Sequence, residues 1–216
     1  MLARTRWLWT IGLGAAVLAC SKVQEQDATL EQVQVAPTTL PPMVDPELQG
    51  GHVGRAPRRL TVAQLDQSIT VAVGRRWNGI DAVAPSLGRA DYAMVVTEST
   101  DPNLVFAKFL EDGAREVCVA QAQADIAATT AANRILAQQL PDNINNLTTL
   151  TAAQIRTNLS YLSVRFWGQP LVGAELDAWT TLFQQLASRA QAISRRDQAL
   201  SALCIALITD PRFMTY

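Results

Sequence analysis

The last third of the chain, residues 151–216, carries apolar side chains at the spacing of three consecutive amphipathic helices, expected at residues 151–168, 173–192 and 197–209. Glycine and proline end the first of these helices at Gly168 and Pro170, and Asp210 with Pro211 ends the last. The pattern predicts a packed helical unit. Its repeating apolar positions are Ile155, Leu159, Leu162, Phe166, Leu176, Trp179, Leu182, Phe183, Leu186, Leu200, Leu203, Cys204, Leu207 and Ile208.

A further helix is expected near residue 61. Thr61 and Gln64 have the spacing of a capping box, and the apolar face that follows them ends at Gly74. Arg58 and Arg59 precede the positive end of this helix, where a positive charge is unfavourable. We therefore expect both arginines to point into solvent or to meet an acidic partner.

The middle of the chain predicts one long helical stretch. Asp101 followed by Pro102 is typical of an N-cap with proline in the first turn. Gly113 lies on the apolar face of this helix, which predicts the close approach of another helix. The alanine-rich run over residues 120–137 continues or restarts the helix, and Pro141 ends it.

Residues 75–100 lack a regular period and predict a long surface connection with a short helix or strand at residues 92–96. Long loops often bind partners, so Trp77 and Tyr92 are candidates for a binding surface together with Trp167. The alternative is that these aromatic rings pack over the core.

Together these patterns predict an all-α fold, an irregular bundle of about five to six helices over residues 58–216. That length suffices for a single domain with a real hydrophobic core.

The N-terminus has the composition of an export signal. Arg4 and Arg6 precede an apolar run over residues 7–19, which is too short to span a bilayer comfortably. Ala19 before Cys20 resembles the bacterial lipoprotein signal, in which a cysteine is acylated and becomes the new N-terminus. Residues 1–19 are then a cleaved signal peptide, and the acyl chains on Cys20 anchor the protein without spanning the membrane. The alternative is an ordinary secretory leader that contains a cysteine.

Residues 20–57 are polar and rich in proline and glycine, which predicts a disordered tether. As a flexible coil, its 37 residues after Cys20 would span roughly 35 Å on average. Ser21 follows the cysteine in place of an aspartate, which favours the outer membrane over the inner one. His52 lies within this tether and has no second metal ligand nearby, so we expect a solvated loop residue.

The charge balance excludes some functions. The chain has 18 basic and 19 acidic side chains, and removal of Arg4 and Arg6 with the leader leaves 16 basic ones. Such a mildly acidic protein is not expected to bind nucleic acid. Because His52 is the single histidine, a histidine-dependent catalytic site within the domain is excluded. We expect no metal and no cofactor.

Cys118 and Cys204 remain once Cys20 is acylated. In an exported protein they can form a disulfide, and two buried free thiols are the open alternative. A cysteine nucleophile is disfavoured because the domain has no histidine to activate it.

Acidic pairs are the remaining candidates for catalysis. Glu111 with Asp112, or Glu175 with Asp177, offers two carboxylates for acid–base chemistry. The simpler interpretation is that they are solvated helix positions, with Arg115 spaced for an ion pair with Glu111 or Asp112.

Two stretches resemble a family of bacterial exported domains of unknown function, which is abundant in planctomycetes and myxobacteria and accompanied in some relatives by cytochrome-like segments. The resemblance implies an exported helical domain. The haem-attachment motif of those relatives is absent from this sequence, and the resemblance implies no catalytic residue. The matching residues are Arg58-Arg59-Leu60-Thr61 through Gly74, Arg165 to Leu171 with Glu175, and Ala206-Leu207 to Asp210-Pro211-Arg212-Phe213.

The sequence favours a lipid-anchored binding or assembly module of the cell envelope, attached to the membrane through Cys20 and recognising an envelope or exported protein. An enzyme or enzyme subunit that acts on envelope polymer through carboxylates is the first alternative. A structural spacer is the second.

Overall fold

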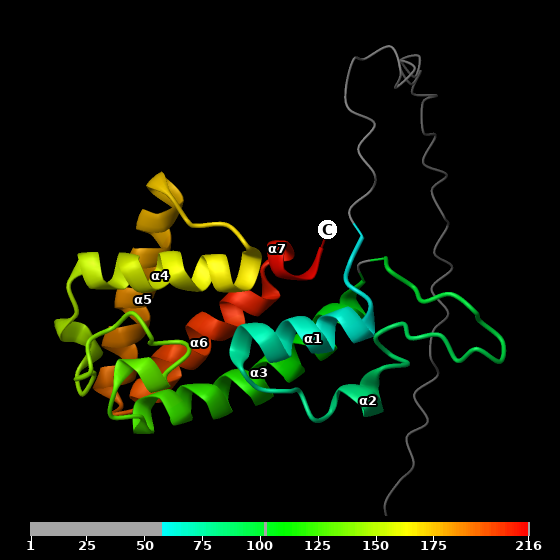
Figure 1. The fold of residues 1–216 in the computed structure, drawn as a ribbon, viewed down its shortest axis with the longest axis horizontal. Coiled ribbons are helices and arrows are strands. Elements are labelled where there is room, and N and C mark those ends of the chain that lie inside the picture. The colour runs from blue at the N-terminus through cyan, green and yellow to red at the C-terminus, as the bar shows by residue number, and fades with distance from the viewer. Residues whose placement is uncertain (1–57, 102, 216) are drawn as a thin grey trace, which may run out of the picture. The chain divides into compact units, whose positions relative to one another are not determined.

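The computed structural model describes residues 58–101 and 103–215 of this chain, so the predictions for the leader, Cys20, the tether and His52 lie outside the described residues. The described part is helical and confirms the all-α fold class (Figure 1). Apart from one isolated antiparallel bridge between Arg59 and Thr215, these residues contain no β-structure. None of their helices combines the length and apolarity needed to cross a membrane.

Five long helices make up the bundle, and two single-turn helices accompany them. The α-helices are α1 (Val62–Val73), α2 (Ile80–Val83), α3 (Leu104–Ala127), α4 (Ala152–Trp167), α5 (Gly173–Ala192), α6 (Arg196–Thr209) and α7 (Pro211–Met214). Two short 3-10 helices, Ala131–Asn133 and Leu147–Thr149, lie in the connection between α3 and α4.

Helix α6 is the centre of the packing. It contacts α3, α4, α5 and α7, and α3 is its most extensive neighbour (Figure 1). Its buried residues lie around most of its circumference, as expected for a helix enclosed by others. Helix α1 packs on α3 and α4. The buried residues of α6 are Ala199, Leu200, Ser201, Leu203, Cys204, Leu207 and Ile208.

The local end signals of α1 and α4 are confirmed. In both capping boxes, at Thr61 and at Thr151, the threonine side chain accepts a hydrogen bond from the backbone of a glutamine three residues later. Gly74 and Gly168 close these helices with φ of 76° and 74°, a conformation that glycine adopts without strain.

The limits predicted for α3 were wrong at both ends. Its N-cap is Asn103, whose Oδ1 accepts from the Phe106 N–H at 2.8 Å, while the Asp101 carbonyl accepts from Arg59. The helix ends at Ala127, and the rest of the alanine-rich run is not α-helical. The reason is tertiary, because Asp125 binds the backbone of residues 135–137 and turns the chain back.

The prediction of a short helix or strand at residues 92–96 was also wrong. These residues form an irregular loop, and the short helix of this region is α2, twelve residues earlier in the chain.

Gly113 is a point of close approach, but the group that approaches it is the indole of Trp77 and not another helix. A Cβ atom at Gly113 would lie 2.5 Å from Trp77 Cδ2, so the ring occupies the space that any side chain would need. Trp77 is 3% exposed. The glycine therefore lets Trp77 cover the surface of α3.

Gly113→Ala is expected to lower the free energy of unfolding by about 2 kcal/mol, because a methyl group in this contact forces the indole off its position. Chemical denaturation followed by circular dichroism measures the change. The double variant Gly113→Ala/Trp77→Leu should lose less than the sum of the two single variants, since the smaller side chain makes room for the methyl group. Additive losses would contradict the contact.

Candidate functional site

Each carboxylate of the two acidic pairs proposed for catalysis forms an ion pair with a basic side chain. Glu111 Oε1 accepts from Arg115 Nε at 3.1 Å, and Glu175 lies 2.7 Å from Arg212. Asp112 pairs with Lys108, and Asp177 pairs with Arg156 of the neighbouring helix. All four are surface pairs, which favours the solvated helix positions over an acid–base site.

Within residues 58–101 and 103–215, no three side chains among histidine, cysteine, aspartate and glutamate come together as a metal site would require.

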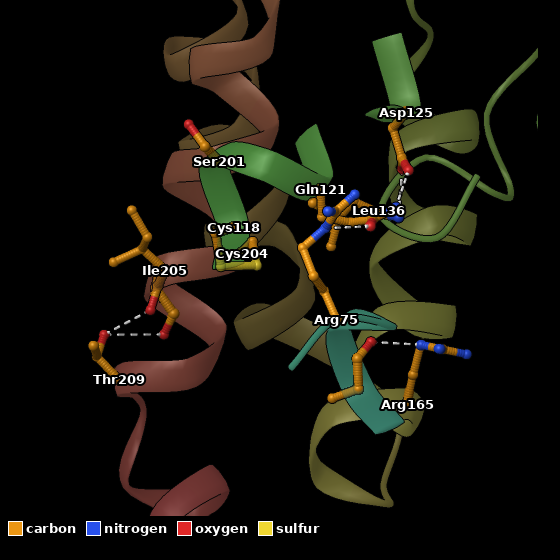
Figure 2. The surroundings of a disulfide bond; sticks show 12 residues. Arg75, Cys118, Gln121, Asp125, Leu136, Arg165, Ser201, Cys204, Ile205 and Thr209 are labelled. Carbon is orange, nitrogen blue, oxygen red and sulfur yellow. Dashed lines mark hydrogen bonds between the residues drawn. A yellow bond between two sulfur atoms is a disulfide. The ribbon is translucent and has the colours of Figure 1, made fainter. Parts of the chain in front are cut away.

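Cys118 on α3 and Cys204 on α6 form a disulfide, with their Cα atoms 5.7 Å apart (Figure 2). The sequence left open a disulfide or two buried free thiols, and this structure contains the disulfide. Both residues are fully buried. The bond joins the two helices that form the largest contact of the core, and neither sulfur is free to act as a nucleophile.

The three aromatic residues proposed as a binding surface lie in different environments. Trp77 is buried against Gly113, so no partner can reach its ring. Trp167 is half-buried: its Nε1–H donates to the Leu207 carbonyl at 3.0 Å, and its ring packs edge-on against Trp179. Tyr92 alone is freely exposed, at 71%.

Arg212 holds the C-terminal helix α7 against the end of α4. Its guanidinium lies 3.8 Å from the centroid of the Trp167 ring and donates two hydrogen bonds to Asp210, at 2.9 and 2.8 Å. The hydrogen bonds to Asp210 raise the pKa of Arg212 above its usual range; burial opposes the shift and Glu175 adds to it. Burial favours the neutral form of Asp210, but its bonds with Arg212 outweigh that and lower its pKa.

Residues that carry the resemblance described above connect the two ends of the domain, through contacts at the C-terminal helix α7 and at both ends of α1. The Leu60 N–H donates to the Met214 carbonyl at 2.7 Å, and the rings of Phe166 and Phe213 lie 5.9 Å apart. Arg165 donates to the carbonyls of Val71 and Ala72 at the end of α1. The motif residues thus join the first and last helices, which is a structural role.

The expectation that the two arginines point into solvent is confirmed for Arg58, which is exposed, and wrong for Arg59, whose side chain is completely buried. The alternative for Arg59, an acidic partner, agrees with the nearby charges of Glu98 and Asp101. It donates to the carbonyls of Leu60, Ser99 and Asp101 and lies 4.4 Å from the centroid of the Phe106 ring. Burial lowers the pKa of the guanidinium, and the charges of Glu98 and Asp101 oppose the shift. Arg59 therefore holds the segment 98–101 against the start of α1.

Asp125 is a second buried ionisable residue, and sequence reasoning missed it. Its carboxylate accepts hydrogen bonds from Gln121 Nε2 and from the backbone N–H groups of Ile135, Leu136 and Ala137, as Figure 2 shows for Leu136. A signal was present, because an aspartate near the C-terminus of a helix is unfavourable unless it has another partner. Its role is to fix the connection that follows α3.

An open depression of about 360 Å³ lies beside the end of α3 and is lined in part by Arg134, Asp142 and Asn145. The Arg134 guanidinium is buried and donates to the carbonyls of Ala128, Pro141 and Asp142. Because these carbonyls already use its donors, Arg134 closes the connection between α3 and α4 and is not available to bind a ligand.

Among the described residues, four exposed apolar side chains lie close together in the connection between α2 and α3. Tyr92, Met94, Val95 and Val96, which we call the apolar tip, are 71%, 88%, 53% and 75% exposed. Figure 1 shows the loop that carries them extending away from the helices. Exposed apolar side chains that cluster in one segment are typical of interaction sites.

Asp91 gives the apolar tip a defined backbone. Its Oδ1 accepts from the N–H groups of Ala93, Met94 and Val95 at 3.2, 2.9 and 3.0 Å. The backbone hydrogen bonds from Val95 and Met94 are the main cause that holds the pKa of Asp91 below its usual range. Tyr92 has a φ of 58°, and its N–H donates to the Val95 carbonyl. The tip is thus a closed turn that presents apolar side chains to the outside.

One residue of this tip, Tyr92, was predicted from the sequence as part of a binding surface. Met94, Val95 and Val96 were missed because a short apolar run predicts a buried strand as readily as an exposed turn. Asp91 was the available signal, because an aspartate side chain often accepts hydrogen bonds from the backbone N–H groups that follow it in a turn.

Comparison with protein-family models, with curated proteins and with solved structures gave no match to this chain.

Proposed function

We propose that this protein is a lipid-anchored module of the bacterial cell envelope that acts by binding and not by catalysis. In this proposal Cys20 is acylated after removal of residues 1–19, and residues 20–57 tether the helical domain to the membrane. The outer membrane is the favoured location. The resemblance to exported bacterial helical domains of unknown function belongs to the same proposal.

The observation that carries the binding role is the apolar tip on its fixed turn. Four exposed apolar side chains on one loop favour a contact surface, which distinguishes a binding module from a spacer that contacts nothing. An enzyme that works through the proposed carboxylates would need them free, whereas each is paired with a lysine or an arginine.

The Cys118–Cys204 disulfide supports the exported location. Disulfides persist in oxidising compartments and are rare in the reducing cytosol. The disulfide between α3 and α6 is therefore consistent with a domain that folds and functions outside the cytoplasm.

Cys20→Ala is the test of anchoring. The wild-type chain, expressed in a Gram-negative host, should incorporate an alkyne analogue of palmitate and fractionate with membranes, because several acyl chains on one residue hold a protein permanently. The variant should incorporate none of the analogue and should lose its membrane attachment through Cys20. Ser21→Ala, one residue further on, is the matched control and should be labelled like the wild type. A wild-type chain that remains unlabelled would remove the basis of the proposal.

A further inference from the structure

The base of the loop that carries the apolar tip is bonded to the segment with which the described domain begins. The Arg59 N–H donates to the Thr100 carbonyl at 3.0 Å, and Arg59 Nε donates to the Asp101 carbonyl at 3.1 Å. On the following helix, the Val62 N–H donates to Glu98 Oε1 at 2.5 Å. The chain that leads back to Cys20 therefore joins the domain at the base of this loop.

The apolar tip carries no charge over residues 92–96. The nearest acidic group in the sequence, Asp91, directs its carboxylate to backbone N–H groups of the turn. Tyr92 adds an amphipathic ring of the kind that is enriched at membrane–water interfaces. Leu104 and Val105, in the first turn of α3, are also exposed, at 89% and 54%.

The size of the tip distinguishes between two kinds of partner. A specific protein–protein interface uses about 20–30 residues on each side. The tip offers four apolar side chains on a single projecting loop, far fewer than such an interface needs. A lipid surface requires no matching shape, so a few apolar side chains suffice if something else keeps the domain near the membrane.

We propose that the apolar tip inserts into the surface of the bilayer in which Cys20 is anchored, so that the domain rests on its own membrane through a second contact. This inference rests on the proposed function. If residues 20–57 tether the domain as proposed, the tether gives the tip an effective concentration of about millimolar at the membrane, so that a weak insertion becomes persistent. The tip and the tether then hold one edge of the domain at the lipid and leave the other surfaces free.

The test places a single environment-sensitive fluorophore on the tip. With Cys20 acylated and Cys118 bridged to Cys204, Met94→Cys supplies one free thiol in the full lipidated protein. Gln185→Cys, on the exposed face of α5, is the matched control. Both proteins are reconstituted into vesicles of phosphatidylethanolamine and phosphatidylglycerol that contain lipids with a quencher on the acyl chain.

We expect the emission of the Met94 probe to move to shorter wavelength and to be quenched by the acyl-chain quencher, while the Gln185 probe stays in water. An anchored protein whose Met94 probe also stays in water would overturn the insertion and leave the proposed anchoring intact. A wild-type chain that is not acylated would remove the anchoring itself, so the two failures are distinguishable.

A second measurement titrates the unacylated mature chain with Cys20→Ala against the same vesicles up to about millimolar lipid, a concentration at which weak insertion by the tip alone is measurable. Met94→Ser/Val96→Ser in this chain should weaken vesicle binding by roughly tenfold or more, since it removes two apolar side chains from the insertion. Thr181→Ser/Gln185→Ser, on α5, should leave binding unchanged. Equal binding of both variants would contradict the proposal.

The fluorescent probe at Met94 gives one further control, which is its emission in the absence of vesicles. A probe already shielded from water without vesicles would overturn the proposal, in favour of a second copy or residues 20–57 as the occupant.

Discussion

Removal of the Cys118–Cys204 disulfide is expected to lower the free energy of unfolding by about 4.5 kcal/mol. The bridge joins residues separated by 86 positions, and closing a loop of that length in the unfolded chain has an entropic effect of this size in the chain-entropy model. For a domain of this length the loss corresponds to a fall in melting temperature of roughly 10–18 °C. Cys118→Ala/Cys204→Ala, followed by thermal denaturation under oxidising conditions, measures it.

Reduction is the control for this prediction. Dithiothreitol should lower the melting temperature of the wild type toward that of the double variant and leave the variant unchanged. Because the bridge is buried, titration of the thiols after the melt checks that the reductant has reached it. A reduced wild type that still melts at the temperature of the oxidised protein would show that the bridge contributes nothing. Two free thiols found before any reduction would show that the other alternative left open by the sequence describes the protein.

The helix ends that were predicted correctly are those fixed by neighbouring residues. The capping boxes at Thr61 and Thr151 and the glycines at Gly74 and Gly168 act within one helical turn, so the sequence alone contains the relevant interactions. Over residues 151–209 the expected helices agree with α4, α5 and α6 to within one residue at every end.

The wrong predictions for Arg59 and Gly113 have a different cause, which is a partner far away in the sequence. Arg59 is buried because the carbonyls of Ser99 and Asp101, some forty residues later, accept its donors. Gly113 accommodates the ring of Trp77 and not a helix. A single sequence reports which groups can bond but not which distant segment reaches them, so a solvated arginine was the more economical interpretation.

The candidate site was predictable only in part for the same reason. Tyr92 was identified as a loop aromatic, and the loop is indeed irregular and exposed. The other apolar residues of the tip are exposed because the loop extends away from the helices, and the sequence does not show this arrangement. That arrangement is set by the bonds of Arg59 and Glu98 at its base. These contacts become visible only in the folded chain.

Asp125→Asn is expected to lower the free energy of unfolding by about 3 kcal/mol, because the substitution places an amide NH₂ where the structure needs an acceptor. In the wild type one carboxylate oxygen accepts from Gln121 Nε2, and the other accepts from the backbone N–H groups of Leu136 and Ala137. An asparagine has one acceptor oxygen, so it can accept either from Gln121 Nε2 or from the backbone N–H groups, but not from both. Gln121 cannot turn its amide freely to compensate, because its Oε1 accepts from Arg75.

Asp142→Asn is the matched control for this substitution. The Asp142 carboxylate is exposed and accepts from one backbone N–H, that of Ala131, at 2.6 Å, so its replacement should cost less than about 1 kcal/mol. Urea denaturation gives both values. Hydrogen exchange adds a local measurement: the amides of Ile135, Leu136 and Ala137 should exchange faster in Asp125→Asn, because the charge that holds them is gone. If both variants were equally stable, Asp125 would not be what turns the chain back after α3, and the end of that helix at Ala127 would need another cause.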